Sequence, residues 1–107
     1  MSGFSNIDPQ ALHALRARRD ILLVDVRSDD ETRRGMIEGA RHIPLQLLPA
    51  QVEFLDRGSA VVFYCQSGAR SMQASAFLAA RGWPEVYNLA GGVMAWVRSG
   101  LPVRVAE

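Results

Sequence analysis

Three short runs of apolar residues predict buried strands. They lie at residues 21–24, 60–64 and 86–89. The first two runs are continuous rather than alternating, which is typical of strands covered on both faces, as in a parallel sheet, whereas the third contains Asn88. A fourth, shorter strand is expected within residues 37–43, which Gly39 interrupts.

Segments with helical spacing separate these runs. Asp8 and Pro9 match an N-cap followed by a first helical residue, and the predicted helix extends to residue 19. Ser28 and Glu31 have the spacing of a capping box, which predicts a short helix ending at Gly35. The remaining expected helices are two short turns within 45–55, a longer helix over 71–81 and a last helix over 93–98. Strands that alternate with helices predict an α/β fold with a mostly parallel sheet.

Length and charge narrow the class of protein. A chain of 107 residues is expected to form one domain over residues 1–107. Its 12 basic residues are scattered and balance 11 acidic ones, so we expect neither nucleic acid nor a membrane as a partner. All the basic residues are arginine, which excludes Schiff-base chemistry and a lysine general base.

The cysteine and histidine content bears on location and cofactors. The one cysteine, Cys65, cannot form an intramolecular disulfide, so the cytoplasm is the expected location. The first residues lack the pattern of a secretion signal, and no apolar run approaches the length of about 20 residues that spans a bilayer. Cys65 with His13 and His42 is a poor donor set for zinc, so we expect no metal and no other cofactor. We place His13 at the surface and His42 near a strand end.

The residues with the clearest chemistry follow the strand predicted at 60–64. This strand leads to Cys65, and the loop before the next helix consists of Gln66, Ser67, Gly68, Ala69 and Arg70. Loop amides and a helix N-terminus stabilise negative charge and lower the pKa of a cysteine thiol. We therefore expect Cys65 to be largely a thiolate at neutral pH. The competing interpretation is a small buried residue that only packs.

Charged residues also follow the neighbouring strand. Asp25 and Arg27 are expected beside Cys65, because sites in parallel sheets gather at the carboxyl ends of strands. Arg70 can bind an anionic substrate or pair with a carboxylate such as Asp25, and both roles stay open. For Asp25 and Arg27 the alternative is a salt-bridged scaffold without a part in the chemistry.

Four segments, in the right order, resemble the motifs of single-domain rhodaneses, the sulfurtransferase homology domains. They read LLVDVR at 22–27, GMIEGARHIP at 35–44, VVFYCQSGARS at 61–71 and VYNLAGGVMAW at 86–96. The resemblance covers nearly the whole chain. Met36 departs from it, standing where the family usually has histidine, and Thr32 stands where an aromatic residue is usual.

The resemblance implies a rhodanese-like α/β fold, with a central, mostly parallel sheet and helices on both faces. It also implies a ping-pong sulfurtransferase without a cofactor. Cys65 would take the sulfane sulfur of a thiosulfate-like anion as a persulfide and pass it to cyanide or a thiol, including a thiol on a protein. The loop of residues 66–70 would hold the persulfide, and Asp25 and Arg27 would frame the pocket.

Two other classes of function are weighed against this one. Some dual-specificity phosphatases also resemble rhodaneses. Phosphatase loops have five residues between cysteine and arginine, whereas four separate Cys65 from Arg70. The tighter loop favours a sulfur atom over a phosphate, and arsenate reductases that use an internal disulfide need a second cysteine. A non-enzymatic binding or regulatory module, or a relay of persulfide sulfur to a protein partner, stays open as an alternative.

Overall fold

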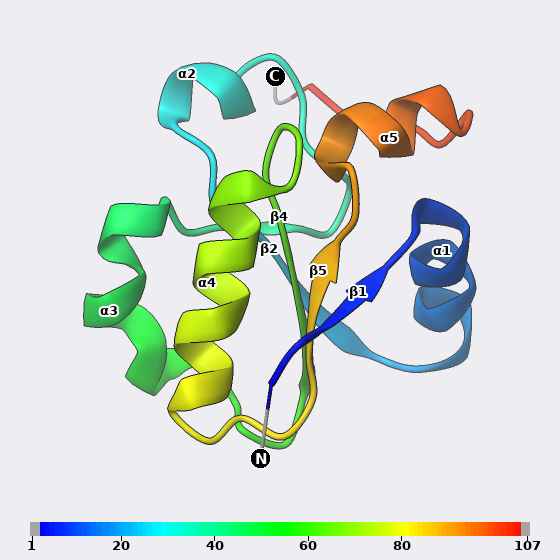
Figure 1. The fold of residues 1–107 in the computed structure, drawn as a ribbon. Helices are drawn as coiled ribbons and strands as arrows, with labels where there is room; N and C mark the ends of the chain where they lie inside the picture. Colours follow the sequence, from blue (N-terminus) through cyan, green and yellow to red (C-terminus); the bar gives the residue numbers. More distant parts are fainter. Residues whose placement is uncertain (1–2, 106–107) are drawn as a thin grey trace.

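The computed structural model describes residues 3–105, and their five strands form one sheet (Figure 1). The strand order is β1-β5-β4-β2-β3, and every neighbouring pair is parallel. The strands are β1 (Ser5–Ile7), β2 (Ile21–Asp25), β3 (Arg41–His42), β4 (Ala60–Tyr64) and β5 (Val86–Leu89). The α/β fold with a parallel sheet is therefore confirmed.

Helices cover both faces of this sheet. The α-helices are α1 (Pro9–Arg18), α2 (Asp29–Thr32), α3 (Leu48–Gln51), α4 (Ala69–Ala80) and α5 (Gly92–Arg98). The 3-10 turns η1 (Leu45–Leu47) and η2 (Val52–Phe54) flank α3. Helices α3 and α4 pack on one face and α1 and α5 on the other (Figure 1). Within residues 3–105, no helix is long and apolar enough to cross a bilayer.

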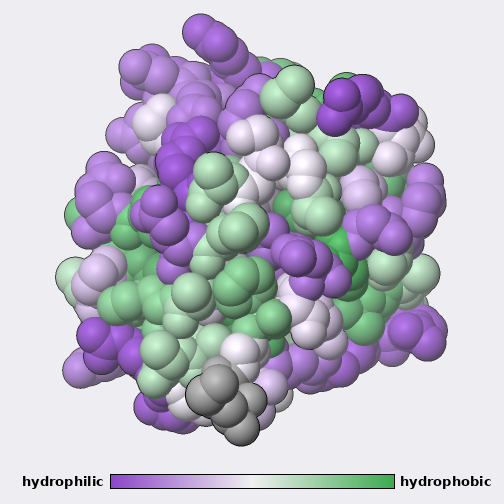
Figure 2. All heavy atoms as spheres, in the orientation of Figure 1, coloured by the Kyte–Doolittle hydropathy of each residue, from purple (hydrophilic) through white to green (hydrophobic). Residues whose placement is uncertain are grey.

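Strand β4 lies at the centre of the sheet and divides the core. Val61, Phe63 and Cys65 point toward α3 and α4, whereas Val62 and Tyr64 point toward α1 and α5. All five side chains are buried, as the continuous apolar run predicted. Apolar side chains also reach the surface over α3 and α4 (Figure 2), and Phe54 in η2 is 77% exposed.

Helices α1 and α2 begin at the predicted caps, although α2 ends at Thr32, before the predicted stop at Gly35. Asp8 Oδ1 accepts a hydrogen bond of 2.7 Å from the amide of Ala11, and Pro9 begins α1. Ser28 and Glu31 form the expected capping box at α2. Pro49 lies in the first turn of α3, where its missing N–H costs little.

Three sequence-based expectations need correction. Strand β1 was not predicted, and it forms by pairing with β5 at the edge of the sheet. Only Arg41–His42 of the segment 37–43 pairs as a strand. Helix α4 begins at Ala69 rather than residue 71, because Gly68, with φ of 112°, ends the loop and the good helix formers after it continue directly into the helix.

Gly92 lets α5 approach the end of β4 at very short range. The amides of Val93 and Met94 donate to the carbonyls of Cys65 and Gln66, at 2.9 and 3.2 Å. A Cβ on Gly92 would lie 2.6 Å from the carbonyl oxygen of Cys65 and 2.5 Å from that of Gln66. Its φ of 62° also lies in the left-handed region. The first turn of α5 therefore holds the loop that follows β4.

Gly92→Ala is expected to destabilise the fold through this backbone clash. Gly100→Ala is the matched control, because Gly100 has φ of 84° but nothing within 4 Å of an added Cβ. Both variants carry a left-handed strain of about 1–2 kcal/mol, and Gly92→Ala adds overpacking of about 1–3 kcal/mol. Urea unfolding measures the difference. Equal unfolding free energies for the two variants would show that the close approach is unimportant.

Candidate active site

Cys65 lies at the carboxyl edge of the sheet, directly after β4. The loop that it begins lies between α2 and α5, at the top of Figure 1. Only 1% of Cys65 is exposed. The sequence predicted this place, because β4 ends where the apolar run ends and the next helix follows after a short loop.

The sulfur of Cys65 receives hydrogen bonds from the loop and from the start of α4. The amides of Gly68 and Ser71 donate to Sγ at 3.1 and 3.4 Å, and the Ser71 hydroxyl lies 3.4 Å away. Burial by itself raises the pKa of the Cys65 thiol. The Ser71 hydroxyl and the amides of Ser71, Gly68 and Ser67 outweigh burial, so the pKa of Cys65 falls below its ordinary value. The site therefore stabilises a thiolate.

Ser71 is the important neighbour of Cys65 that the sequence analysis did not single out. Its buried hydroxyl lies within hydrogen-bond distance of the Gly68 carbonyl at 3.1 Å and of Asn88 Oδ1 in β5. Asn88 in turn donates from Nδ2 to Asn6 Oδ1 in β1 at 3.0 Å. The sequence did contain one signal for this contact. Asn88 is a polar residue within a buried strand, and a buried polar side chain needs a hydrogen-bond partner in the core.

Arg70 forms an ion pair with two parallel hydrogen bonds to Glu31 in α2. Its two terminal nitrogens donate to the carboxylate at 2.6 and 2.8 Å. Arg70 lowers the pKa of Glu31 to about 2, against the effect of burial and with help from Ser28. Of the two roles considered for Arg70, binding a substrate anion or pairing with a carboxylate, the structure shows the pairing. The partner is Glu31, however, and not the Asp25 named as an example.

Asp25 and Arg27 form a buried ion pair under the loop. Arg27 Nη2 donates to Asp25 Oδ2 at 2.7 Å and to the carbonyl of Gly35 at 2.6 Å. Tyr64 lies beside the pair and accepts a hydrogen bond of 3.0 Å from the amide of Ile37. Burial, with a further contribution from Asp25, raises the pKa of the Tyr64 phenol. These contacts match the scaffold interpretation of the pair.

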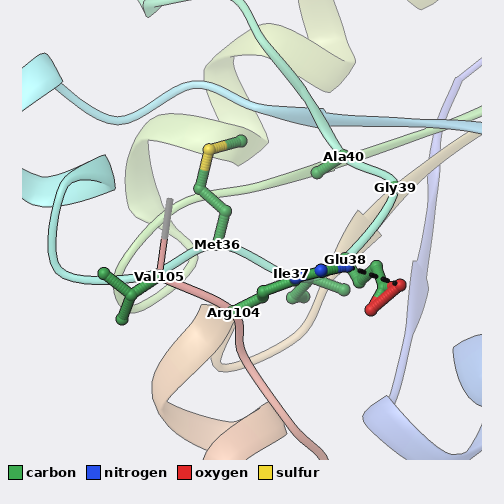
Figure 3. A pocket seen from close by; sticks show the side chains of 7 residues that line it. All are labelled: Met36, Ile37, Glu38, Gly39, Ala40, Arg104 and Val105. Carbon is green, nitrogen blue, oxygen red and sulfur yellow. Dashed lines mark ion pairs between the residues drawn. The ribbon is translucent and has the colours of Figure 1, made fainter. Parts of the chain in front are cut away.

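Two pockets lie beside this scaffold. The first, about 240 Å³, adjoins the active-site loop. Its lining residues are Arg27, Glu31, Arg34, Gly35, Gln66, Val93, Val97 and Val103. The second contains Met36, Glu38 and Arg104 but no residue of the loop 65–70 (Figure 3). Of these two pockets, the first is the one that adjoins the active-site loop, through Gln66.

The histidines lie away from the sulfur of Cys65. His42 Nε2 lies 2.7 Å from the carbonyl of Arg27, at the end of β3. His13 is exposed, with its ring edge toward Trp96. In the part of the chain that the structure describes, no three His, Cys, Asp or Glu side chains are grouped for a metal ion.

Removal of the Ser71 hydroxyl is expected to raise the pKa of Cys65. Ser71→Ala removes the hydroxyl that lies 3.4 Å from Sγ and lowers the pKa of Cys65, whereas burial, which raises this pKa, stays. The pH dependence of alkylation by iodoacetamide should shift to higher pH. Ser75→Ala is the matched control, because the equally buried Ser75 hydroxyl donates to the carbonyls of Ser71 and Tyr87 instead. An unshifted Ser71→Ala profile would refute the role of this hydroxyl.

Replacement of Arg70 is expected to return the pKa of Glu31 from about 2 toward 4.5. Because the folded pKa is depressed, the ionised carboxylate stabilises the fold fully above pH 4.5, and this stabilisation is lost as the pH falls toward 2. In Arg70→Gln the unfolding free energy should fall less steeply over that range. NMR titration of Glu31 and urea unfolding at several pH values measure both effects.

Arg33→Gln is the control for this experiment, since Arg33 pairs with Asp30 at 3.0 Å. It should leave the titration of Glu31 near that of the wild type. A Glu31 pKa that stays low in Arg70→Gln would mean that the capping box alone stabilises the carboxylate.

Known proteins resemble this chain in sequence. A family model described as Rhodanese-like domain matches residues 8–99. A protein named sulfurtransferase from Allochromatium vinosum is 42% identical over 104 residues, which cover 96% of this chain and 97% of that protein. The thiosulfate sulfurtransferase GlpE of Ectopseudomonas mendocina is 34% identical over 107 residues, which cover 100% of this chain and 96% of that protein.

A solved structure shares the fold. The crystal structure of a rhodanese-related protein from Thermoplasma volcanium matches with a TM-score of 0.89 and 26% sequence identity, and the match covers 96% of this chain and 100% of that one. The expected rhodanese-like fold, a parallel sheet with helices on both faces, is confirmed. The chain belongs to the rhodanese-like domain family.

Proposed function

We propose that this protein is a sulfurtransferase that carries sulfane sulfur as a persulfide on Cys65. The observation that carries the proposal is the set of donors around Cys65 Sγ. Two amides and a hydroxyl reach the sulfur in a buried place, and they favour its anionic form. The thiolate is the nucleophilic form of cysteine. The names of the relatives support sulfur transfer, and that of GlpE supports thiosulfate as a donor.

In the first half of the reaction the Cys65 thiolate attacks the outer sulfur of thiosulfate. A bond forms between Sγ and that sulfur, and the bond to the sulfonate sulfur breaks with its electron pair. Sulfite leaves with two negative charges, and the persulfide anion on Cys65 keeps one. The charges balance without an oxidant, and no proton has to move. The loop amides that favour the thiolate favour the persulfide anion for the same reason.

In the second half a nucleophilic acceptor attacks the outer sulfur of the persulfide. Cyanide or a thiolate forms the new bond, and the sulfur–sulfur bond to Cys65 breaks. The electron pair returns to Sγ, which restores the thiolate. The donors that lower the pKa of Cys65 therefore also make it a good leaving group.

The charged residues around Cys65 are proposed to position the loop. Arg70 connects the start of α4 to Glu31 in α2, and its positive charge stays near the donor anion. Arg27 is held by Asp25 and by the carbonyl of Gly35, and it lines the pocket beside the loop. Gln66, Ser67, Gly68 and Ala69 form the rest of the proposed persulfide-binding loop.

The structure disfavours the phosphatase alternative at one residue. A phosphatase needs the loop arginine to bind the phosphoryl oxygens, but both terminal nitrogens of Arg70 donate to Glu31. A non-enzymatic binding module does not need a stabilised thiolate, so the donors around Cys65 favour the enzyme.

Intact-mass spectrometry after thiosulfate treatment tests the proposal. The wild-type protein should gain about 32 Da, one sulfur atom, and lose it again when cyanide is added. Cys65→Ser should gain nothing, because it lacks the thiolate. No gain on the wild type with thiosulfate or with an organic persulfide would favour the binding module. Hydrolysis of an aryl phosphate that depends on Cys65 would favour the phosphatase.

A further inference from the structure

Three arginines lie in or next to the pocket beside the active-site loop, and two of them pair with carboxylates. Arg27 pairs with Asp25 at 2.7 Å, and Arg70, at the start of α4, pairs with the lining residue Glu31. The pocket itself is lined by Arg27 and Arg34.

 Arg34 is the third arginine of this region, and within residues 3–105 its exposed side chain forms no ion pair or hydrogen bond. It is therefore the cation of the pocket that is available to a ligand.

Part of the pocket wall is apolar and held in place. Val103 packs against Gly35, and the backbones of Met36 and Arg104 exchange hydrogen bonds of 3.0 and 2.7 Å. This pairing fixes the segment around Arg104 beside the segment that follows α2. Val97, on α5, completes the wall and is 50% exposed.

An apolar wall beside a cation points to an organic anion as the ligand. Thiosulfate has a negative charge but no hydrocarbon part that could cover Val97 and Val103. Burial of an aliphatic stem against these side chains is favourable at about 25 cal/mol per Å². A carboxylate on the same molecule would form an ion pair with the guanidinium of Arg34.

We propose that this pocket binds the sulfur acceptor, and that the acceptor is a small organic thiol that carries a carboxylate. Arg34 binds the carboxylate, and Val97 and Val103 contact the aliphatic stem. The thiol end lies toward Gln66, which lines the pocket and follows Cys65 in the chain. The proposal rests on the proposed function, because it assigns the acceptor of the second half-reaction.

The transfer step balances without a further reactant. The acceptor thiolate attacks the outer sulfur of the Cys65 persulfide and forms an organic persulfide. The bond between this sulfur and Sγ breaks, and its electron pair returns to Cys65 as the thiolate. Arg34 takes no part in bond formation, so it acts as a specificity-determining residue.

The neighbouring pocket does not offer the same arrangement. Its arginine, Arg104, pairs with Glu38 at 3.2 Å (Figure 3). Val103 and Arg104 are adjacent in the chain but line different pockets, so the segment they share separates the two.

Single-turnover transfer from the persulfidated protein tests the proposal, with mercaptopropionate as the anionic acceptor and mercaptoethanol as the neutral one. Arg34→Gln should slow transfer to mercaptopropionate about threefold to tenfold at low acceptor concentration. Transfer to mercaptoethanol should change by less than about twofold. Arg33→Gln is the matched control, because it removes the same charge one residue away, where Arg33 pairs with Asp30 and does not line the pocket.

The proposal would be overturned if Arg34→Gln slowed transfer equally to both acceptors. It would also be overturned if Arg34→Gln and Arg33→Gln slowed transfer to mercaptopropionate equally. Binding is measured separately on Cys65→Ser, where mercaptopropionate should shift the NMR signals of the Val97 and Val103 methyl groups, and Arg34→Gln should abolish the shifts. If the NMR signals shift but the wild type forms no persulfide, the pocket binds the organic anion and the proposed function is rejected. A persulfide on the wild type without these shifts would support the proposed function and reject the pocket as the acceptor site.

Discussion

A negative charge on a buried sulfur is the constraint on which the rest of this site depends. Burial opposes ionisation of Cys65, so the charge needs donors that are already in place. The amides of Gly68 and Ser71 can point at Sγ only if the loop curls tightly between β4 and α4. Gly68 makes that curl possible, because its φ of 112° is one that other residues rarely adopt.

The loop is held from two sides. On one side, the first turn of α5 donates to the carbonyls of Cys65 and Gln66, at a distance that only a glycine at position 92 permits. On the other side, Arg70 connects α4 to Glu31. Glu31 also closes the capping box with Ser28, so a residue in the first turn of α2 positions the active-site loop as well. Fold and site thus share the same contacts.

Local signals were predicted well from the sequence, and contacts between distant segments were not. Asp8 and Ser28 cap helices a few residues away, so their patterns can be found in a short window. Strand β1 has three residues and depends on pairing with β5, which no local pattern encodes. Arg70 and Glu31 are 39 residues apart, so the choice of Glu31 over Asp25 follows from where α2 lies. Ser71 was missed because its role depends on the side of α4 that faces Cys65.

The most direct test of this account is the ionisation of Cys65 in the unmodified protein, followed by the ultraviolet absorbance of its thiolate as the pH is raised. Because Cys65 is the one cysteine of the chain, no other thiolate contributes to the signal. The account predicts a midpoint below that of an ordinary cysteine thiol. A midpoint at or above the ordinary value would mean that burial outweighs the donors, and it would contradict the central claim.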